Sequence, residues 1–205
     1  MQKTVILASQ SPRRKMLLEK IGIRAEIIPS VLPEVITETD PERAVRALSL
    51  QKAADIAAQC RKKCREAVVI GADTVVAADG RILGKPATHE EAAEMIRMLS
   101  GREHAVYTGV TIIHTGGSGE DTVRTFAEKT IVSVYPMSEE EIQEYAASME
   151  PMDKAGAYGI QGSFARYIRR ICGDYNNVVG LPAAAVYQEL KSAGYIGSGA
   201  GIRQE

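Results

Sequence analysis

A charged segment near the N-terminus carries side chains that could bind phosphate groups. This segment, Ser9-Gln-Ser-Pro-Arg13-Arg14, lies between a strand-like run and the start of a helix. Backbone N–H groups at a helix N-terminus bind anions, and arginines add charge-assisted hydrogen bonds. An ordinary capped helix with solvated arginines is the alternative, although cations in a first turn oppose the helix dipole. This segment alone leaves both interpretations open.

Lysines supply further positive charge. Lys52 follows Val45 and Leu48 at helical spacing, so it lies on the apolar stripe of an expected helix. Its ammonium either extends from the edge of the core into solvent or points into a cleft that holds an anion. Lys85, in Gly-Lys-Pro, belongs either to the same cleft or to an exposed turn.

Asp73 offers a carboxylate at the end of the apolar run Val68–Ile70. Open α/β sheets place reactive groups at strand ends, where this carboxylate could bind a divalent cation or accept a proton from water. Capping of a turn is the alternative interpretation.

A glycine-rich segment carrying both charges, DKAGAYGIQG, begins with Asp153 and Lys154 and contains Gln161. So many glycines in an ordered region favour a backbone that approaches a ligand closely. The segment GDYNNVVGLP, which leads into the last expected helix, could close the same site.

Alternating strand and helix signals must position these side chains. Helices are predicted to begin at the caps Ser11, Asp40, Thr88 and Ser138, and one more near Pro182. Strands are expected over residues 4–8, 25–28, 67–71, 74–78, 81–83, 105–114 and 122–135. The pattern predicts a mixed α/β protein whose sheet is not purely parallel. We expect one domain over residues 1–193 and a loose C-terminal tail over 194–205.

Composition excludes several classes of protein. The 205 residues include 25 basic and 26 acidic side chains and are 45% hydrophobic, which argues against a disordered chain and against a strongly basic nucleic-acid binder. Apolar runs fall short of the roughly 20 residues that span a bilayer, and the N-terminus lacks a signal-peptide pattern. Three cysteines do not suggest a disulfide framework, and the histidines lack paired metal spacing. A cytoplasmic protein is expected.

Read together, the segments LASQSPRR, GADTVV, GKP, SGREHAVYTGV, DKAGAYGIQG and GDYNNVVGLP resemble the Maf family of nucleoside triphosphate pyrophosphatases, in the family's order and across residues 3–190. The resemblance implies an elongated mixed β-sheet flanked by helices, with two lobes around a central cleft, usually as a homodimer. It also implies cleavage of the α–β phosphoanhydride of a nucleoside triphosphate, with a divalent metal cation, Mg or Mn, as cofactor. No nucleic acid polymer and no membrane are expected as partners.

The resemblance assigns roles to individual residues. Asp73 matches the proton acceptor, while Arg13, Thr74 and Gln161 match positions linked to base choice and resemble the branch that acts on dTTP and UTP. A carboxamide offers one donor and one acceptor, which suits O4 and N3–H of uracil or thymine. The positions that match polar residues around the triphosphate are Ser9, Arg14, Lys52, Lys85, Asp153 and Lys154.

The expected metal ligands are Asp73 and Glu34. Pro33 departs from the family's usual polar residue, so Glu38 is a possible substitute for Glu34. Whether Asp73 acts as base, metal ligand or both stays open, as does the choice between normal and modified pyrimidine nucleotides. A non-catalytic nucleotide-binding regulator of cell division and septum formation is an alternative function. A phosphatase or kinase is another, although a Walker-type GxxxxGK[ST] run is absent from the sequence.

Overall fold

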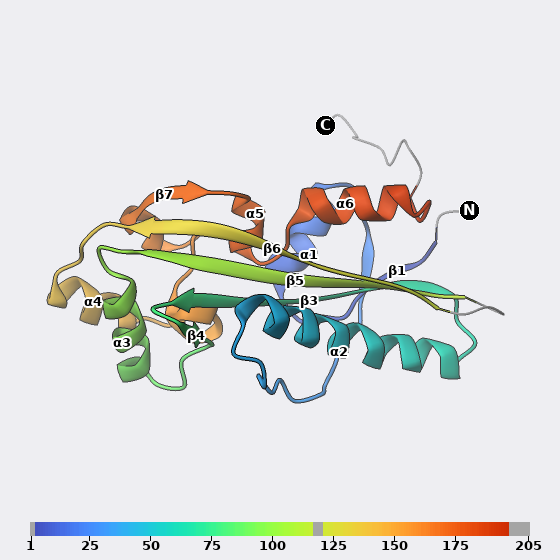
Figure 1. The fold of residues 1–205 in the computed structure, drawn as a ribbon, viewed down its shortest axis with the longest axis horizontal. Helices are drawn as coiled ribbons and strands as arrows, with labels where there is room; N and C mark the ends of the chain where they lie inside the picture. The colour runs from blue at the N-terminus through green and yellow to red at the C-terminus, as the bar shows by residue number, and fades with distance from the viewer. Residues whose placement is uncertain (1–2, 117–120, 197–205) are drawn as a thin grey trace.

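A long mixed β-sheet organises the chain (Figure 1). The computed structural model describes residues 3–116 and 121–196, within which the strand order is β2-β1-β3-β5-β6-β7, with β4 added beside β3. β1 runs parallel to β2 and β3, whereas the other pairs are antiparallel. The strands are β1 (Val5–Leu7), β2 (Ala25–Ile27), β3 (Ala67–Ala78), β4 (Arg81–Leu83), β5 (Glu103–Thr115), β6 (Thr122–Val134) and β7 (Ile168–Cys172). The expected mixed α/β class is confirmed.

The helices begin where local capping signals predict. Ser11 accepts a hydrogen bond from the Arg14 amide, and Asp40 accepts one from the Arg43 amide, each with proline at the first helical position. The helices are α1 (Pro12–Lys20), α2 (Pro41–Lys62), α3 (His89–Leu99), α4 (Glu139–Ala146), α5 (Tyr175–Val179) and α6 (Ala183–Ser192), and the 3-10 turns are η1 (Pro151–Asp153), η2 (Ala155–Ala157) and η3 (Ser163–Tyr167).

β3 differs from the expectation of two separate strands. It runs without interruption because β5 pairs with its residues from Ala67 to Ala77. Asp73 therefore lies in the middle of its own strand, and its predicted place at a strand end is wrong. The expected hairpin to β4 is confirmed, with Asp79 and Gly80 at positive φ in its turn.

One edge of β3 is open beside Asp73. β1 pairs with β3 only over Val68–Ile70, and β4 pairs with it only from Val76 onward. Within the described residues, no strand covers this side of β3 between those two pairings. Asp73 is therefore not at the end of its own strand but just beyond the end of the neighbouring strand β1. Side chains from both faces of the sheet reach this gap.

Helices cover both faces of the sheet (Figure 1). α2 packs on one face, where Ile56 and Ala57 meet Ile6 and Val69. The larger core lies on the other face and includes Leu17 and Leu18 of α1 together with residues of α3, α4, α5 and α6. Val68 and Val69 point into different cores, as successive residues of a strand buried on both faces do.

Two glycines let α2 approach the sheet closely. A Cβ at Gly71 would lie 2.3 Å from the Ser49 carbonyl oxygen, and one at Gly109 would lie 2.2 Å from that of Val45. Both distances are far below van der Waals contact. These glycines therefore fix the distance between α2 and β3, and with it the position of Lys52.

At the C-terminus, Tyr195 and Ile196 continue the folded domain. The Tyr195 amide donates to the Leu190 carbonyl, and Ile196 is buried. These two residues of the predicted loose tail are therefore packed against the domain, and the rest of that tail, 197–205, lies outside the described residues. The division into two lobes stays a prediction, although α3 and α4 lie toward one end of the long strands and α6 toward the other (Figure 1).

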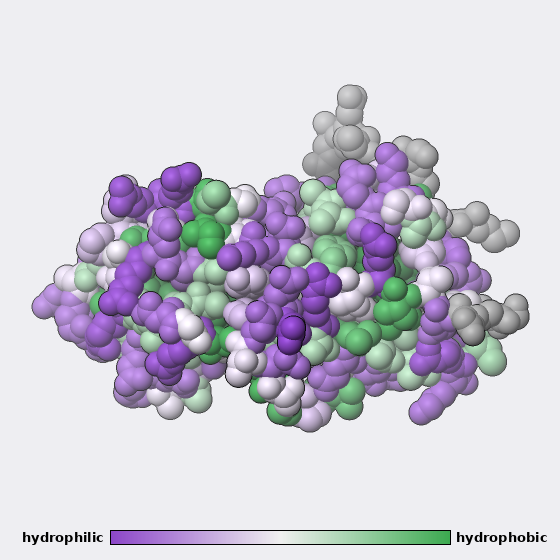
Figure 2. Space-filling model, in the orientation of Figure 1, coloured by the Kyte–Doolittle hydropathy of each residue, from purple (hydrophilic) through white to green (hydrophobic). Residues whose placement is uncertain are grey.

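The surface is mostly hydrophilic on the face shown in Figure 2, with apolar residues in small, separate groups. No helix among the described residues is long and apolar enough to cross a membrane. Several exposed apolar side chains, including Val31, Val35 and Ile36, lie in the segment between β2 and α2 that carries Glu34.

Candidate active site

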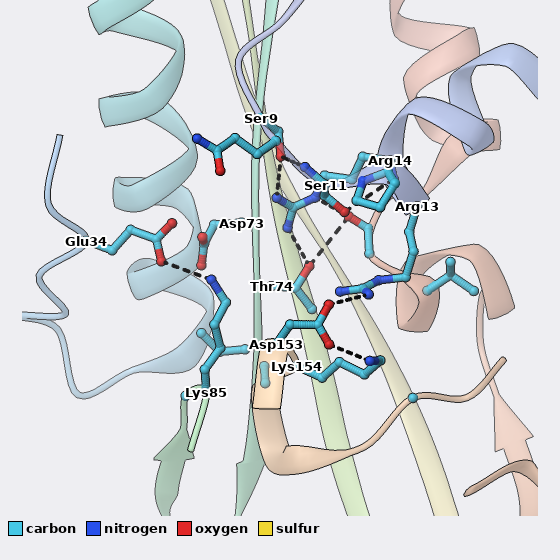
Figure 3. Close-up of a pocket in the computed structure, with 18 of the residues that line it drawn as sticks. Ser9, Ser11, Arg13, Arg14, Glu34, Asp73, Thr74, Lys85, Asp153 and Lys154 are labelled. Carbon is cyan, nitrogen blue, oxygen red and sulfur yellow. Dashed lines mark hydrogen bonds and ion pairs between the residues drawn. The ribbon is translucent and has the colours of Figure 1, made fainter. Parts of the chain in front are cut away.

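A cleft of about 830 Å³ opens at the gap beside β3, within the size range of small-molecule sites. Figure 3 shows the side chains that reach it from several elements. All the site residues predicted from the sequence line this cleft: Ser9, Arg13, Arg14, Glu34, Lys52, Asp73, Thr74, Lys85, Asp153, Lys154 and Gln161. Glu38, the possible substitute for Glu34, is exposed and does not line the cleft.

Lys52 joins the two predicted metal-ligand carboxylates. Its Nζ lies 2.5 Å from Asp73 Oδ1 and 2.6 Å from Glu34 Oε1. Lys85 Nζ reaches the other Glu34 oxygen at 3.9 Å, as the dashed line in Figure 3 marks. Asp73 is only 6% exposed, so its charge needs this cation nearby. The ammonium of Lys52 thus occupies the point between two carboxylates where a positive charge is stabilised.

The charge state of Glu34 follows from the same contacts. Burial raises the pKa of Glu34, but the hydrogen bond from Lys52 and the charges of Lys52 and Lys85 outweigh it and lower the pKa overall. Glu34 is therefore ionised at neutral pH and available as an acceptor of cations.

Arg14 is buried at the back of the cleft and uses all three guanidinium nitrogens. Nε donates to the Gly180 carbonyl at 2.8 Å, Nη1 to Ser9 Oγ at 3.1 Å and Nη2 to Thr74 Oγ1 at 3.1 Å. These acceptors are neutral oxygens, so none of these hydrogen bonds neutralises its charge. Burial lowers the pKa of Arg14, and the charges of Asp73 and Glu34 oppose that effect. Arg14 therefore ties α1, β3 and the segment before α6 together and directs positive potential into the cleft.

Asp153 is surrounded by cations. Arg13 Nη1 lies 2.9 Å from one of its oxygens, and Lys154 Nζ donates to the other (Figure 3). Burial raises the pKa of Asp153, but the hydrogen bonds from Lys154 and Arg13 lower it overall. Since a carboxylate repels phosphate, we interpret Asp153 as the group that holds these two cations in place.

Successive residues of β3 contribute to the cleft from opposite sides. Asp73 accepts a hydrogen bond from Lys52 of α2. Thr74 instead accepts one from Arg14 of α1, on the other side (Figure 3). Side chains of successive strand residues alternate between faces, so only a site at an open sheet edge brings both together. Arg13 lines the same cleft as Asp73, but its side chain bonds to Asp153 rather than to Asp73.

The histidines and cysteines form no second site in the part of the chain that the structure describes. His89 bonds to a main-chain carbonyl, His104 to the Tyr158 hydroxyl, and His114 to Glu66. No group of three or more histidine, cysteine, aspartate or glutamate side chains there could hold a metal ion. The free cysteines are Cys60, Cys64 and Cys172.

Sequence analysis missed residues that support the site from behind. Glu150 and Tyr145 hold the turn that carries Gln161, and Gly71 sets the depth of α2. A glutamate before a proline and a glycine within a β-rich run carry no distinctive local pattern. Only their contacts in the folded chain disclose these roles.

Two comparisons of the sequence with known proteins agree with each other. The sequence model of the family described as "Maf-like protein" matches residues 4–193. A protein of Agathobacter rectalis named dTTP/UTP pyrophosphatase is 50% identical over 199 residues, covering 93% of this chain and 97% of the relative. One of the same name from Geobacillus sp. is 51% identical over 194 residues, covering 94% and 100%. A solved Mycobacterium abscessus nucleoside-triphosphatase / dITP/XTP pyrophosphatase has a TM-score of 0.37 at 17% identity over 65% of this chain and 75% of that one.

Proposed function

Since the chain belongs to the Maf family, we propose that its cleft hydrolyses dTTP and UTP, or modified pyrimidine nucleotides, to the monophosphate and pyrophosphate. The observation that carries the proposal is the meeting of Asp73 with Lys52, Lys85 and Arg14 in one cleft. The relatives named dTTP/UTP pyrophosphatase share about half of its residues over nearly the whole chain, which supports the same substrate class.

The triphosphate binds among the cations of the cleft. Lys85 and Lys154 lie at its sides and Arg14 at its back, so negative charge that develops on the phosphates during the reaction is offset by fixed positive charges. Phosphoryl transfer depends mainly on such positioning and electrostatic stabilisation. The cleft needs no covalent intermediate with the protein.

Asp73 orients a water molecule and accepts its proton. The water oxygen attacks the α-phosphorus, the bond from that phosphorus to the bridging oxygen breaks, and pyrophosphate leaves. Lys52 contacts Asp73 Oδ1 directly and so holds its carboxylate in the cleft. A carboxylate is a weak base, so Asp73 depends on further activation of the water.

A divalent cation fits the donor set of Asp73 and Glu34. Mg²⁺ commonly binds through one or two carboxylates together with substrate phosphates, so these two side chains would suffice as the protein's ligands. When bound, Mg²⁺ or Mn²⁺ would lower the pKa of water and neutralise phosphate charge. The two carboxylates would hold it through the oxygens that do not contact Lys52, Asp73 Oδ2 and Glu34 Oε2, while Lys52 keeps both side chains at the cleft.

Gln161 reads the base. It lies on an exposed turn at the cleft, where its carboxamide can donate to O4 and accept from N3–H of uracil or thymine. Cytosine presents the opposite pattern at these two positions. With its carboxamide held in one orientation, Gln161 would therefore select dTTP and UTP over CTP.

A product-resolved assay across the common and modified nucleoside triphosphates tests the proposal. With Mg²⁺ or Mn²⁺, we expect release of pyrophosphate and the monophosphate, with the highest kcat/KM for pyrimidine nucleotides that carry O4. Nucleotide binding without turnover would favour the regulator of cell division and septum formation, and inorganic phosphate as first product would favour a phosphatase. Either result would reject the proposal.

The expected homodimer is tested by light scattering. A homodimer would have twice the chain mass of 22.1 kDa.

A further inference from the structure

Gln161 sits on a tight turn that begins at Gly159 and ends at Gly162. The Gly162 amide donates to the Gly159 carbonyl at 3.1 Å, which places Gln161 at the third position of the turn. No hydrogen bond from the Gln161 side chain fixes it to another part of the described chain. The position of Gln161 at the cleft therefore depends on how the turn itself is held.

Glu150 and Tyr145 hold both ends of this turn. The Tyr145 hydroxyl accepts from the Gly159 amide at 3.3 Å and donates to Glu150 Oε1 at 3.0 Å. The other carboxylate oxygen, Oε2, accepts from the Ser163 amide at 2.9 Å and from Ser163 Oγ at 2.8 Å. We call this pair of side chains the Tyr145–Glu150 clamp.

The clamp is fixed in its own position. Tyr145 is 2% exposed and packs against Phe164, with ring centroids 5.0 Å apart. Burial raises the pKa of Glu150, but hydrogen bonds from Ser163 and Tyr145 outweigh it, so the carboxylate stays ionised and remains a strong acceptor. These contacts hold Tyr145 and Glu150 rigidly beneath the turn.

The glycines of the turn match the clamp closely. A Cβ at Gly162 would lie 2.1 Å from Glu150 Oε1, and one at Gly159 would lie 2.7 Å from Lys154 Cε. The turn backbone therefore lies directly on the side chains of Glu150, a member of the clamp, and of Lys154. The glycine pattern around Gln161 follows from this close approach rather than from flexibility.

Glu150 also reaches the phosphate side of the cleft. Its main-chain carbonyl accepts from Lys154 Nζ at 2.6 Å, and Lys154 in turn contacts Asp153. One residue thus links the turn that carries Gln161 to a cation of the predicted phosphate site.

We propose that Glu150, acting with Tyr145, is a positioning residue that sets the orientation of Gln161 and thereby the choice of base. The proposal rests on the function proposed above, in which Gln161 reads the base. Glu150 lies below the turn and is not itself a group that touches the substrate. Its effect should fall on recognition of the nucleotide rather than on the chemical step.

Two substitutions separate the loss of the carboxylate charge from the loss of its hydrogen bonds. Glu150→Ala removes the acceptors for Ser163 and Tyr145 and releases the turn. Glu150→Gln keeps an oxygen that can accept from Ser163 and an amide group that can donate to the Tyr145 oxygen. Glu144→Ala, at an exposed position on the neighbouring helix α4, is the matched control.

Steady-state kinetics with UTP and CTP test the proposal. For Glu150→Ala we expect KM for UTP to rise about tenfold or more, with a smaller change in kcat and a lower preference for UTP over CTP. Glu150→Gln should stay within about threefold of the wild-type enzyme, since its hydrogen bonds persist, and Glu144→Ala should match the wild type. A Glu150→Ala enzyme with unchanged KM and unchanged preference would overturn the proposal, and so would equal losses in the Gln and Ala variants.

Amide hydrogen exchange supplies a readout that needs no turnover. The Ser163 amide should be protected in the wild type and in Glu150→Gln but exchange rapidly in Glu150→Ala, while the amides of β5 remain unchanged. Equal protection in all three proteins would refute the clamp.

If Glu150→Ala fails to fold, Tyr145→Phe takes its place, because this variant loses the contact to Gly159. An unchanged preference for UTP over CTP in Tyr145→Phe would then overturn the proposal. A wild-type protein that releases no pyrophosphate from UTP would reject the proposed function, whereas Ser163 exchange would still report on the clamp.

Discussion

At the scale of residues, the site is a set of carboxylates each held by cations. Lys52 bonds to Asp73 and Glu34, and Asp153 is held by Arg13 and Lys154. Removing one partner from such a buried or half-buried set leaves a charge without compensation. Single substitutions here should therefore have specific effects on both chemistry and folding.

Replacing Asp73 with Asn should remove the proposed proton acceptor while keeping the shape of the side chain. We expect turnover to fall by a factor of about 10²–10⁴, the usual contribution of a general base, while nucleotide binding stays measurable. Pyrophosphate release and calorimetric binding of a non-cleavable UTP analogue measure the two effects. Full activity in this variant would remove Asp73 from the mechanism.

Arg14→Lys tests the guanidinium that joins three segments. One ammonium cannot reproduce the geometry of the three bonds to Gly180, Ser9 and Thr74, so buried acceptors lose their donors. We expect the free energy of unfolding to fall by about 1–3 kcal/mol, measured by urea denaturation. Arg24→Lys, at an exposed position, is the control. Equal free energies of unfolding for the two variants would show that the Arg14 contacts contribute nothing to stability.

At the scale of elements, the open edge of β3 creates the site. Capping signals before α1, α2 and α4 are local, and they predict where these helices begin. The gap between β1 and β4 is non-local, because it depends on which strand pairs with which residue of β3. The sequence therefore predicts that Asp73 follows a buried run, but it cannot predict that β3 continues past it.

Gly71→Ala tests the close approach of α2 to the sheet. The new Cβ would lie 2.3 Å from the Ser49 carbonyl oxygen, so the helix must move outward. We expect a loss of about 1–3 kcal/mol in the free energy of unfolding, together with weaker activity because Lys52 moves with α2. Gly84→Ala is the stability control, since a Cβ there meets nothing within 4 Å. Unchanged stability and activity in Gly71→Ala would refute the account of this packing.

At the scale of the whole molecule, segments far apart in sequence meet at one cleft. Their residue types predict its chemistry, because serines, arginines, lysines and a carboxylate suit a triphosphate. Contacts within the site are less predictable: Asp153 lines the cleft as predicted, but its ion pairs with Arg13 and Lys154 are not indicated by the sequence. Such partner choices depend on the relative position of η1 and α1, which no local pattern encodes.

Stability should depend on pH through a buried histidine. Burial lowers the pKa of His104 to about 4, from an ordinary value near 6.5. Between these values the unfolded chain binds a proton that the folded protein excludes, so stability falls as pH decreases from about 6.5 to 4. The full shift in the pKa of His104 corresponds to a change of roughly 3 kcal/mol in the free energy of unfolding.

Chemical denaturation across this pH range measures the effect. His104→Gln should flatten the dependence of unfolding free energy on pH relative to wild type, whereas His89→Gln, at an exposed position, should not. Parallel curves for the wild type and His104→Gln would contradict the buried, neutral state of His104.

The central claim is that water attacks the α-phosphorus of a nucleotide held beside Asp73. Hydrolysis of UTP in H₂¹⁸O, followed by mass spectrometry of both products, tests it most directly. The account predicts one ¹⁸O atom in UMP, none in pyrophosphate, and neither product in Asp73→Asn above trace levels. Label in pyrophosphate or in inorganic phosphate would contradict it.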